Sequence, residues 1–176
     1  YPECSARPLA RMVQSLNDQL AGADEFLSPE NSIIVLDLGW LTVGTAGTPR
    51  EIVWRWLADL LVHPEMGIVT KVRRVDVRDA LIHVAKLYMR KSRGERVTVT
   101  EWRAARYQAQ KATSAAAADA AAAADADAAA YAAAYAAARI TFTRWAIEHW
   151  RELAGLDTGP DIDVTAVDNA LARIEG

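Results

Sequence analysis

One stretch of the chain, residues 112–138, constrains the fold more than any other. Residues 115–138 comprise 19 alanines, three aspartates and two tyrosines. Alanine is the strongest intrinsic helix former, and neither glycine nor proline interrupts the run. At a rise of about 1.5 Å per residue, such a helix spans roughly 40 Å, the full width of a domain of this size. The sequence therefore predicts a long alanine-rich helix over about residues 114–154.

The alanine tract has two interpretations. It can be a central helix that the other helices of the chain surround, because alanine lets neighbouring backbones approach closely. It can also be a seam through which two copies of the chain form a homo-oligomer. At about 100° per residue, Asp119, Asp125 and Asp127 point in three different directions, so part of the tract faces water. We favour the central helix and keep self-association as the alternative.

Apolar spacing and helix start signals predict further helices. Apolar residues recur at helical spacing in residues 6–20, 52–61 and 76–89. Ser28-Pro29 is a start signal, and Thr48-x-x-Glu51 and Thr98-x-x-Glu101 are capping boxes. Residues 33–41 are almost continuously apolar and could form a buried strand. The start signal before them favours a buried helix instead.

The remaining segments complete an all-α prediction. An unbroken helix over residues 99–154 would reach roughly 84 Å, so we expect a break near Thr113-Ser114. Residues 66–69 are interpreted as a short extended piece, and a last helix is expected over residues 164–174. The prediction is one all-α domain over residues 1–176, a helical bundle of six or seven helices.

Composition limits the class of protein. A chain of 176 residues can bury a core without disulfides or metals. Its single cysteine, Cys4, excludes an internal disulfide and fits a reducing compartment, so we expect a cytoplasmic protein. No window is apolar enough for a membrane span, and nothing resembles a signal peptide. The chain begins at Tyr1 rather than Met, which is compatible with removal of a leader or a few residues.

The sequence holds no pattern that predicts catalysis, a metal or a cofactor. We interpret His63 as a capping or loop residue, place His83 beside an apolar helix stripe, and interpret His149 as a hydrogen-bonded core histidine. No two histidines have the spacing of a metal pair. Asp161-x-Asp163 fits a loop and helix cap, and Gly44-x-x-Gly47 lacks the lysine of a phosphate loop. We therefore predict a protein that is not an enzyme, with no cofactor.

Charge is unevenly distributed along the chain. The segment 71–111 has 12 Lys and Arg against 4 Asp and Glu, although the whole chain has a net charge of −3. Such a segment could bind phosphates of a nucleic acid, or it could pair with the acidic remainder or face solvent. No Asn, Gln or Ser pattern beside the arginines supports base readout. The candidate phosphate contacts are Arg73, Arg74, Arg90, Lys91, Arg93 and Arg96.

Two tryptophans are candidates for contact with a protein partner. Trp102 stands at the start of a predicted helix, and Trp150 lies at the edge of the apolar stripe of the last long helix. Neither is required for a predicted core face. Exposed tryptophan is frequently an anchor of protein interfaces. This favours a non-enzymatic protein-binding module, with nucleic-acid binding through the basic segment as the alternative.

Parts of the sequence resemble a type of helical protein found in high-GC actinobacteria and their phages. The similarity lies in residues 2–4 and 16–20, and in residues 44–49 and 55–59. The tract that ends in Tyr-Ala-Ala-Ala-Arg139 is similar to alanine-rich tracts of predicted immunity-type proteins. The resemblance covers about a third of the chain and does not extend to the basic segment. It implies an immunity role, or a phage accessory role directed at the host, and it implies no activity.

Overall fold

The computed structural model describes residues 4–21, 26–122 and 128–156, with the side chains of residues 113 and 115–133 outside the description. These residues form six α-helices, one 3₁₀ helix and no strand, which confirms the all-α prediction. The helices are α1 (Arg7–Leu20), α2 (Pro29–Leu41), α3 (Arg50–Val62), η1 (Ile68–Lys71), α4 (Val75–Ser92), α5 (Val99–Ala122) and α6 (Ala128–Leu153). The last helix expected over residues 164–174 lies outside the described residues.

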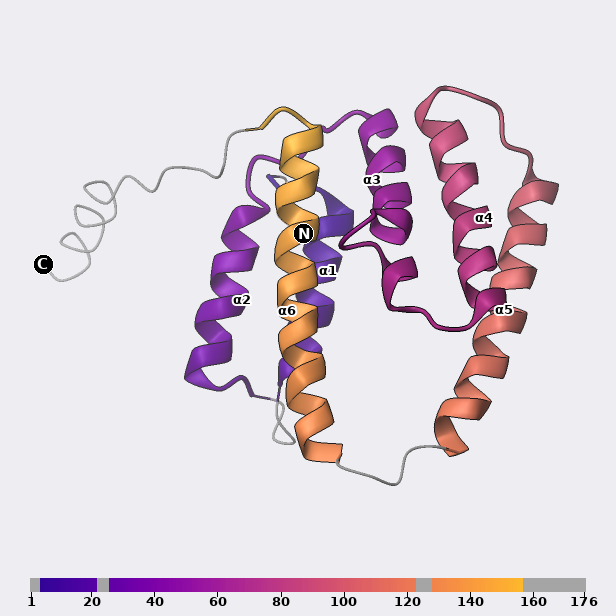
Figure 1. The fold of residues 1–176 in the computed structure, drawn as a ribbon. Helices are drawn as coiled ribbons and strands as arrows, with labels where there is room; N and C mark the ends of the chain where they lie inside the picture. The colour runs from indigo at the N-terminus through magenta and orange to yellow at the C-terminus, as the bar shows by residue number, and fades with distance from the viewer. Residues whose placement is uncertain (1–3, 22–25, 123–127, 157–176) are drawn as a thin grey trace, which may run out of the picture.

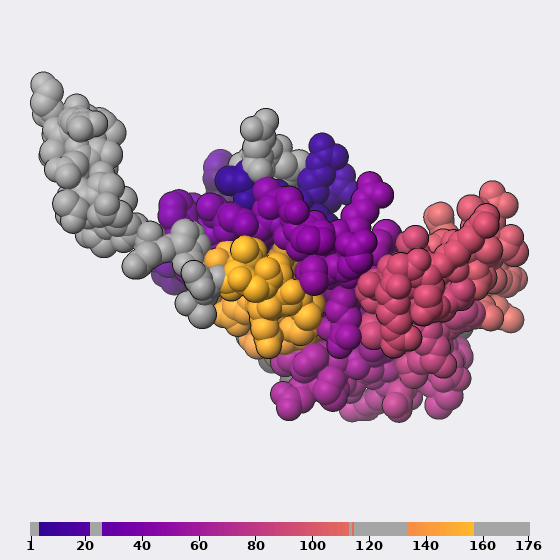
Figure 2. Space-filling model, turned by 90° about the horizontal axis from the view of Figure 1, so that it is seen from above, coloured from indigo at the N-terminus to yellow at the C-terminus, as the bar shows by residue number. Residues whose placement is uncertain are grey.

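The helices form a four-helix core with a two-helix extension (Figure 1). α1, α2 and α3 all pack on α6, and the buried apolar cluster draws its side chains from these four helices. α4 packs on α3, whereas α5 packs on α4 alone among the described elements. Seen from above, the α4–α5 hairpin is a lobe at one side of the molecule (Figure 2).

A pair of tryptophans forms the centre of the core. Trp56 of α3 and Trp150 of α6 are 2% and 1% exposed, and their rings meet edge to face with centroids 4.9 Å apart. The indole N–H of Trp56 donates to the carbonyl oxygen of Ala146 at 2.7 Å, and that of Trp150 donates to the Thr48 hydroxyl at 3.0 Å. Each indole is therefore buried with its polar atom satisfied.

The start of the chain is fastened to the turn that follows α2. The backbone N–H of Gly44 donates to the Cys4 carbonyl at 2.9 Å, and the N–H of Ala6 donates to the Thr45 hydroxyl at 2.9 Å. Gly44 has a φ of 80°, a conformation that glycine adopts without steric cost. The guanidinium of buried Arg151 donates to the carbonyls of Leu41 and Val43 at 3.2 and 2.9 Å. The end of α6 is thereby held beside the end of α2.

The alanine tract does not form the single central helix expected over residues 114–154. α5 continues through Thr113 and Ser114 to Ala122, and α6 begins at Ala128, so the predicted break at Thr113-Ser114 was wrong. Threonine and serine cost a helix interior only a few tenths of a kcal/mol, too little to end it. Among the described side chains, the buried core cluster draws on the bulky part of α6, including Ile147.

Two other local predictions were wrong, and one was confirmed. The expected extended piece at residues 66–69 overlaps the 3₁₀ helix η1. Thr48 does not cap α3, because its hydroxyl donates to the Thr45 carbonyl and accepts from Trp150. The capping box at α5 is present: the N–H of Glu101 donates to the Thr98 hydroxyl at 3.2 Å, and the N–H of Thr98 donates to the Glu101 carboxylate at 2.7 Å.

The core position of Trp150 gives a stability prediction. Trp150→Ala removes a fully buried indole and leaves a cavity, so we expect a loss of about 3–5 kcal/mol in the free energy of unfolding, measured by urea denaturation. Trp40→Ala, at a tryptophan that is 46% exposed, is the matched control and should cost no more than about 1 kcal/mol. Equal losses in the two variants would contradict the assignment of Trp150 to the core.

Candidate functional site

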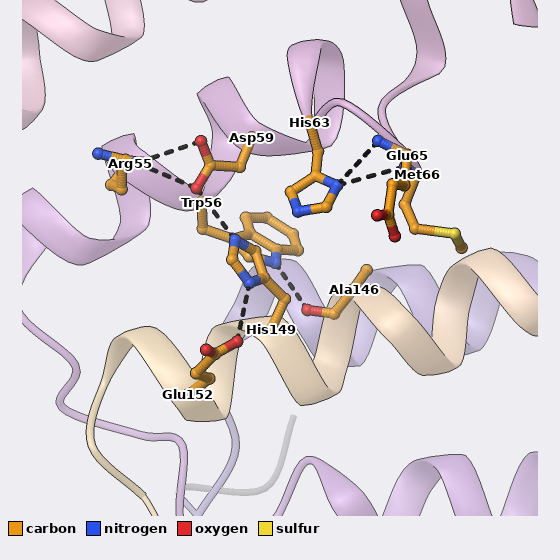
Figure 3. A network of polar contacts seen from close by, with 9 residues as sticks. All are labelled: Arg55, Trp56, Asp59, His63, Glu65, Met66, Ala146, His149 and Glu152. Atoms are coloured by element: carbon orange, nitrogen blue, oxygen red, sulfur yellow. Dashed lines mark hydrogen bonds and ion pairs between the residues drawn. The ribbon is translucent and has the colours of Figure 1, made fainter. Parts of the chain in front are cut away.

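A network of polar side chains connects α3 to α6 (Figure 3). The Arg55 guanidinium Nε donates to both carboxylate oxygens of Asp59, at 3.1 and 3.0 Å. Nε2 of His149 lies 3.0 Å from Oδ2 of Asp59, and Nδ1 of the same ring lies 3.3 Å from Oε2 of Glu152. Asp59 is buried, with its carboxylate held between a guanidinium and an imidazole.

Helical spacing and aromatic packing place these groups. Arg55 precedes Asp59 by four residues on α3, a spacing at which helix side chains meet. On α6, the ring of Trp145 stacks on His149 at 5.4 Å between centroids, with 9° between the planes. The ring of His63 lies against both, 5.2 Å from Trp145 and 5.7 Å from His149. The imidazole of His149 is consequently fixed in orientation.

The network has the chemistry of an inter-helix brace. A ring nitrogen that faces a carboxylate oxygen has to donate a hydrogen, because an ionised carboxylate is only an acceptor. Nε2 of His149 faces the Asp59 carboxylate and Nδ1 faces the Glu152 carboxylate, so each ring nitrogen has a hydrogen-bond partner. This confirms the prediction of a hydrogen-bonded core histidine.

The other two histidines also have defined partners. His63 ends α3, and its Nδ1 accepts from the backbone N–H groups of Glu65 and Met66 at 3.3 Å each, which confirms its predicted capping role. Nδ1 of His83 lies 2.8 Å from the side-chain oxygen of Gln108 and so links α4 to α5. Among the described residues, no three His, Cys, Asp or Glu side chains are arranged to hold a metal ion.

The brace is testable by a double-mutant cycle. Asp59→Asn and His149→Gln each remove one side of a contact whose side chains are 11% and 12% exposed. We expect a coupling free energy of about 0.5–3 kcal/mol from the urea unfolding of the single and double variants. Glu152→Gln alters the contact of a side chain that is 80% exposed and should change stability by less than about 0.5 kcal/mol. Strict additivity of Asp59→Asn and His149→Gln would show that the pair is not coupled.

The structure does not bring the six predicted phosphate contacts together. Arg73 and Arg74 precede α4, whereas Arg90, Lys91, Arg93 and Arg96 lie at or beyond its other end. Arg90 follows Arg74 by 16 positions along α4, a distance of about 24 Å. Arg74 pairs with Asp76 at 2.8 Å, and Arg90 pairs with Glu95 and Glu101. The segment therefore contributes internal ion pairs as well as exposed charge.

A different group of cations shares an exposed stretch of α5. Arg103, Arg106 and Lys111 are exposed, and Tyr107 between them is 69% exposed. Among the described residues, no carboxylate lies within ion-pair distance of these three cations. They belong to the basic segment but were not among the predicted contacts. Their helical spacing was the sequence signal that could have grouped these cations. Their exposure could not be predicted, because it depends on α5 packing on α4 alone among the described elements.

Glu101 joins the hairpin turn to the first turn of α5. The Arg90 guanidinium, together with the backbone and hydroxyl of Thr98, lowers the pKa of the Glu101 carboxyl from 4.5 to about 2. The same contact raises the pKa of Arg90 above its usual value. The ionised carboxylate of Glu101 is therefore the form that makes the contacts with Arg90 and Thr98 at the hairpin turn.

The depressed pKa of Glu101 gives a pH prediction. Its contribution to stability is complete above the unfolded pKa of 4.5 and is lost as the pH falls through about 2. As the pH falls through that interval, the protection factors of backbone amides at the start of α5, which correct for the intrinsic pH dependence of exchange, should decrease progressively in the wild type. Glu101→Gln should exchange faster at neutral pH and show a weaker pH dependence. Identical pH profiles for the two proteins would refute the role of this carboxylate.

The two predicted tryptophan contacts have different outcomes. Trp150 is 1% exposed, so its assignment as a surface contact was wrong: its indole packs on Trp56 instead. Trp102 is partly buried, with its ring 5.1 Å from that of Tyr88, which in turn stacks on Trp54 at 5.8 Å. The three rings connect α5, α4 and α3. A role for Trp102 in binding a partner stays a prediction.

The sequence reasoning missed an exposed apolar stripe on α2. Ile33, Leu36 and Trp40 are 69%, 73% and 46% exposed, and their spacing places them within about 60° on one side of the helix. The opposite side, including Leu38, packs into the core. The helix is therefore buried on one face only, which corrects the expectation of a buried helix. The sequence did not predict this exposed face, because residues 33–41 are almost continuously apolar. Such a run has no polar side that would indicate which face of the helix points to solvent.

The surface also has shallow clefts. One of about 510 Å³ lies between α4 and α5 and is lined by acidic, basic and amide groups, including Asp79, His83 and Lys111. Two smaller ones, of about 390 and 260 Å³, follow the seam between α1 and α6 and share Arg139. None combines an enclosed shape with converging polar groups, which is the usual form of a small-molecule site.

Comparison with protein-family models, curated proteins and solved structures finds no match. Among the described residues, no helix is both long enough and apolar enough to cross a membrane. Functional inference therefore depends on the surfaces themselves, of which the α2 stripe and the cationic stretch of α5 are the most distinctive.

Proposed function

We propose that this chain is a non-enzymatic helical module that binds a protein through the outer face of α2. The observation that carries the proposal is the apolar stripe of Ile33, Leu36 and Trp40 on a helix whose other face is anchored in the core. Contiguous apolar surface of this kind marks interaction sites on soluble proteins. A helix that is rigidly held also costs little entropy when a partner packs on it.

The chemistry of the stripe indicates the kind of partner. Two aliphatic side chains and one tryptophan along a helix complement the apolar face of another helix, packed side by side. Trp40 is the natural anchor, since tryptophan is enriched among residues that dominate binding energy. An immunity or phage accessory factor acting on a host protein in the cytoplasm is the biological setting that we propose, supported by the sequence resemblance and the single cysteine.

A capture experiment with matched variants tests this proposal. The wild-type chain, Leu36→Asp and Val75→Asp are each used to capture proteins from a lysate of a high-GC actinobacterium, with nuclease and raised salt. Val75 is 69% exposed at the start of α4, far from α2 in sequence, and an acidic residue is favourable at a helix start. We expect a stoichiometric protein with the wild type and Val75→Asp, and at least about a tenfold loss with Leu36→Asp, or roughly 1.4 kcal/mol.

The same experiment distinguishes a second candidate function, nucleic-acid binding. Arg103, Arg106 and Lys111 around Tyr107 favour it, because they are exposed and have no ion-pair partner among the described side chains. Lysine and arginine neutralise phosphates, and tyrosine can stack on a base. Captured material that is lost with nuclease or raised salt, and also lost in the Arg103→Glu and Arg106→Glu variants, would favour nucleic-acid binding and contradict the protein-binding proposal. Recovery that is insensitive to Leu36→Asp would also contradict the α2 surface.

A further inference from the structure

Two of the surface clefts lie end to end along the seam between α1 and α6. Arg139 lines both of them and joins them into one groove. On α1, the first cleft, of about 390 Å³, is lined from Pro8 to Ser15, and the second, of about 260 Å³, is lined from Leu16 to Leu20. No lining residue belongs to α2, so this α1–α6 groove is a surface separate from the α2 stripe.

The two clefts of the groove differ in chemistry. Polar side chains gather in the first cleft, which is lined by Arg11, Ser15, Arg139 and Thr143. The second cleft is lined mainly by apolar side chains, among them Leu16, Leu20 and Ala136. No aspartate or glutamate is among the described residues that line either cleft. The groove therefore has a cationic, hydrogen-bonding end and an apolar end.

The polar groups at the cationic end are not used by the fold. Neither Arg11 nor Arg139 forms an ion pair with a described carboxylate, and the Arg139 guanidinium lies over the ring of Tyr135, 5.5 Å from its centroid. Thr143 is only 4% exposed, and its hydroxyl has no hydrogen-bond partner among the described residues. No fully buried side-chain oxygen of the described residues lacks a partner, so this hydroxyl opens onto the cleft that Thr143 lines. The cationic end therefore offers two guanidiniums and a hydroxyl to an anion.

The dimensions of the groove favour a single alkyl chain as the apolar part of a ligand. α1 packs on α6, and packed helices lie about 8–10 Å apart, so the seam between them is narrow. A third helix, about 10–12 Å across with its side chains, would rest on such a seam and could not enter it. From Arg11 to Leu20 the groove follows α1 for about 14 Å. A zigzag chain with carbon–carbon bonds of about 1.5 Å spans that length with roughly eleven carbon atoms.

We propose that the α1–α6 groove binds a single-chain carboxylate amphiphile, of which a fatty acid of about twelve carbon atoms is the simplest example. The carboxylate lies between Arg11 and Arg139 and accepts hydrogen bonds from both guanidiniums and from the Thr143 hydroxyl. Charge-assisted hydrogen bonds of this kind are stronger than those between neutral groups. The alkyl chain runs past Ala136 toward Leu20, where its burial removes apolar surface from water.

Titration of the full chain with sodium dodecanoate below its critical micelle concentration, followed by calorimetry and NMR, tests this site. One ligand should bind per chain, with the largest amide shifts in α1 and in residues 135–143. Arg11→Gln combined with Arg139→Gln should weaken binding at least about tenfold, because the charge-assisted hydrogen bonds are lost. Arg7→Gln is the control: it also removes a cation from α1, at an exposed side chain that does not line the groove, and should keep the affinity within about twofold.

The apolar end has its own matched pair of variants. Ala136→Asp places a carboxylate in the second cleft, beside the alkyl chain, and should weaken dodecanoate binding at least about tenfold. Ala137→Asp adds the same charge at the next position, which is exposed and outside the groove, and should keep the affinity within about twofold. Urea denaturation of each variant distinguishes a loss of binding from a loss of folding.

Any of five results would overturn the proposal. Two concern the groove itself: dodecanoate that shows no saturable binding, or an affinity that Arg11→Gln with Arg139→Gln leaves unchanged. Equal binding of dodecyltrimethylammonium, which has the same chain and a positive charge, would show that the carboxylate is not recognised. Loss of binding in Leu36→Asp would place the amphiphile on the α2 stripe. Binding to vesicles of phosphatidylglycerol, without binding of monomeric dodecanoate, would identify a membrane surface as the partner instead.

Discussion

The edge-to-face contact of Trp56 with Trp150 is the interaction on which the rest of the core depends. It fixes α3 against α6, and the hydrogen bond from Trp56 to the Ala146 carbonyl sets how closely the two helices approach. Ala146, which is fully buried, makes this approach possible because a methyl group leaves room for an indole. With α3 and α6 so joined, Asp59 and His149 meet in the same interface and add a polar brace to the aromatic one.

The number of neighbours that each helix has explains which helix faces remain exposed. α6 has neighbours on several sides, whereas α2 and α5 stand at opposite edges of the molecule (Figure 1). An edge helix is covered on one face only, so the character of its other face decides what it can bind. On α2 that face is aliphatic and aromatic, with Trp40 at one end; on α5 it carries Arg103, Arg106 and Tyr107. The two edges of the molecule therefore differ in chemical character.

Arg151 joins the last turn of α6 to the end of α2. Its buried guanidinium donates to the carbonyls of Leu41 and Val43. The helix that carries the exposed apolar stripe is therefore anchored at its C-terminal end as well as along its inner face, which includes Leu38.

Local sequence signals determined the helices themselves: the apolar spacing of α1, the Ser28 cap of α2 and the Thr98 capping box of α5 were all readable from a few adjacent residues. Those signals fix backbone conformation through interactions within one or two turns. Only the tertiary structure decided which faces were buried. Trp150 entered the core because α3 supplies Trp56, and Thr48 lost its capping role because a distant indole took its hydroxyl. The α2 stripe stayed exposed because no described helix packs beyond it, a property that depends on how many neighbours a helix has and that its own residues do not encode.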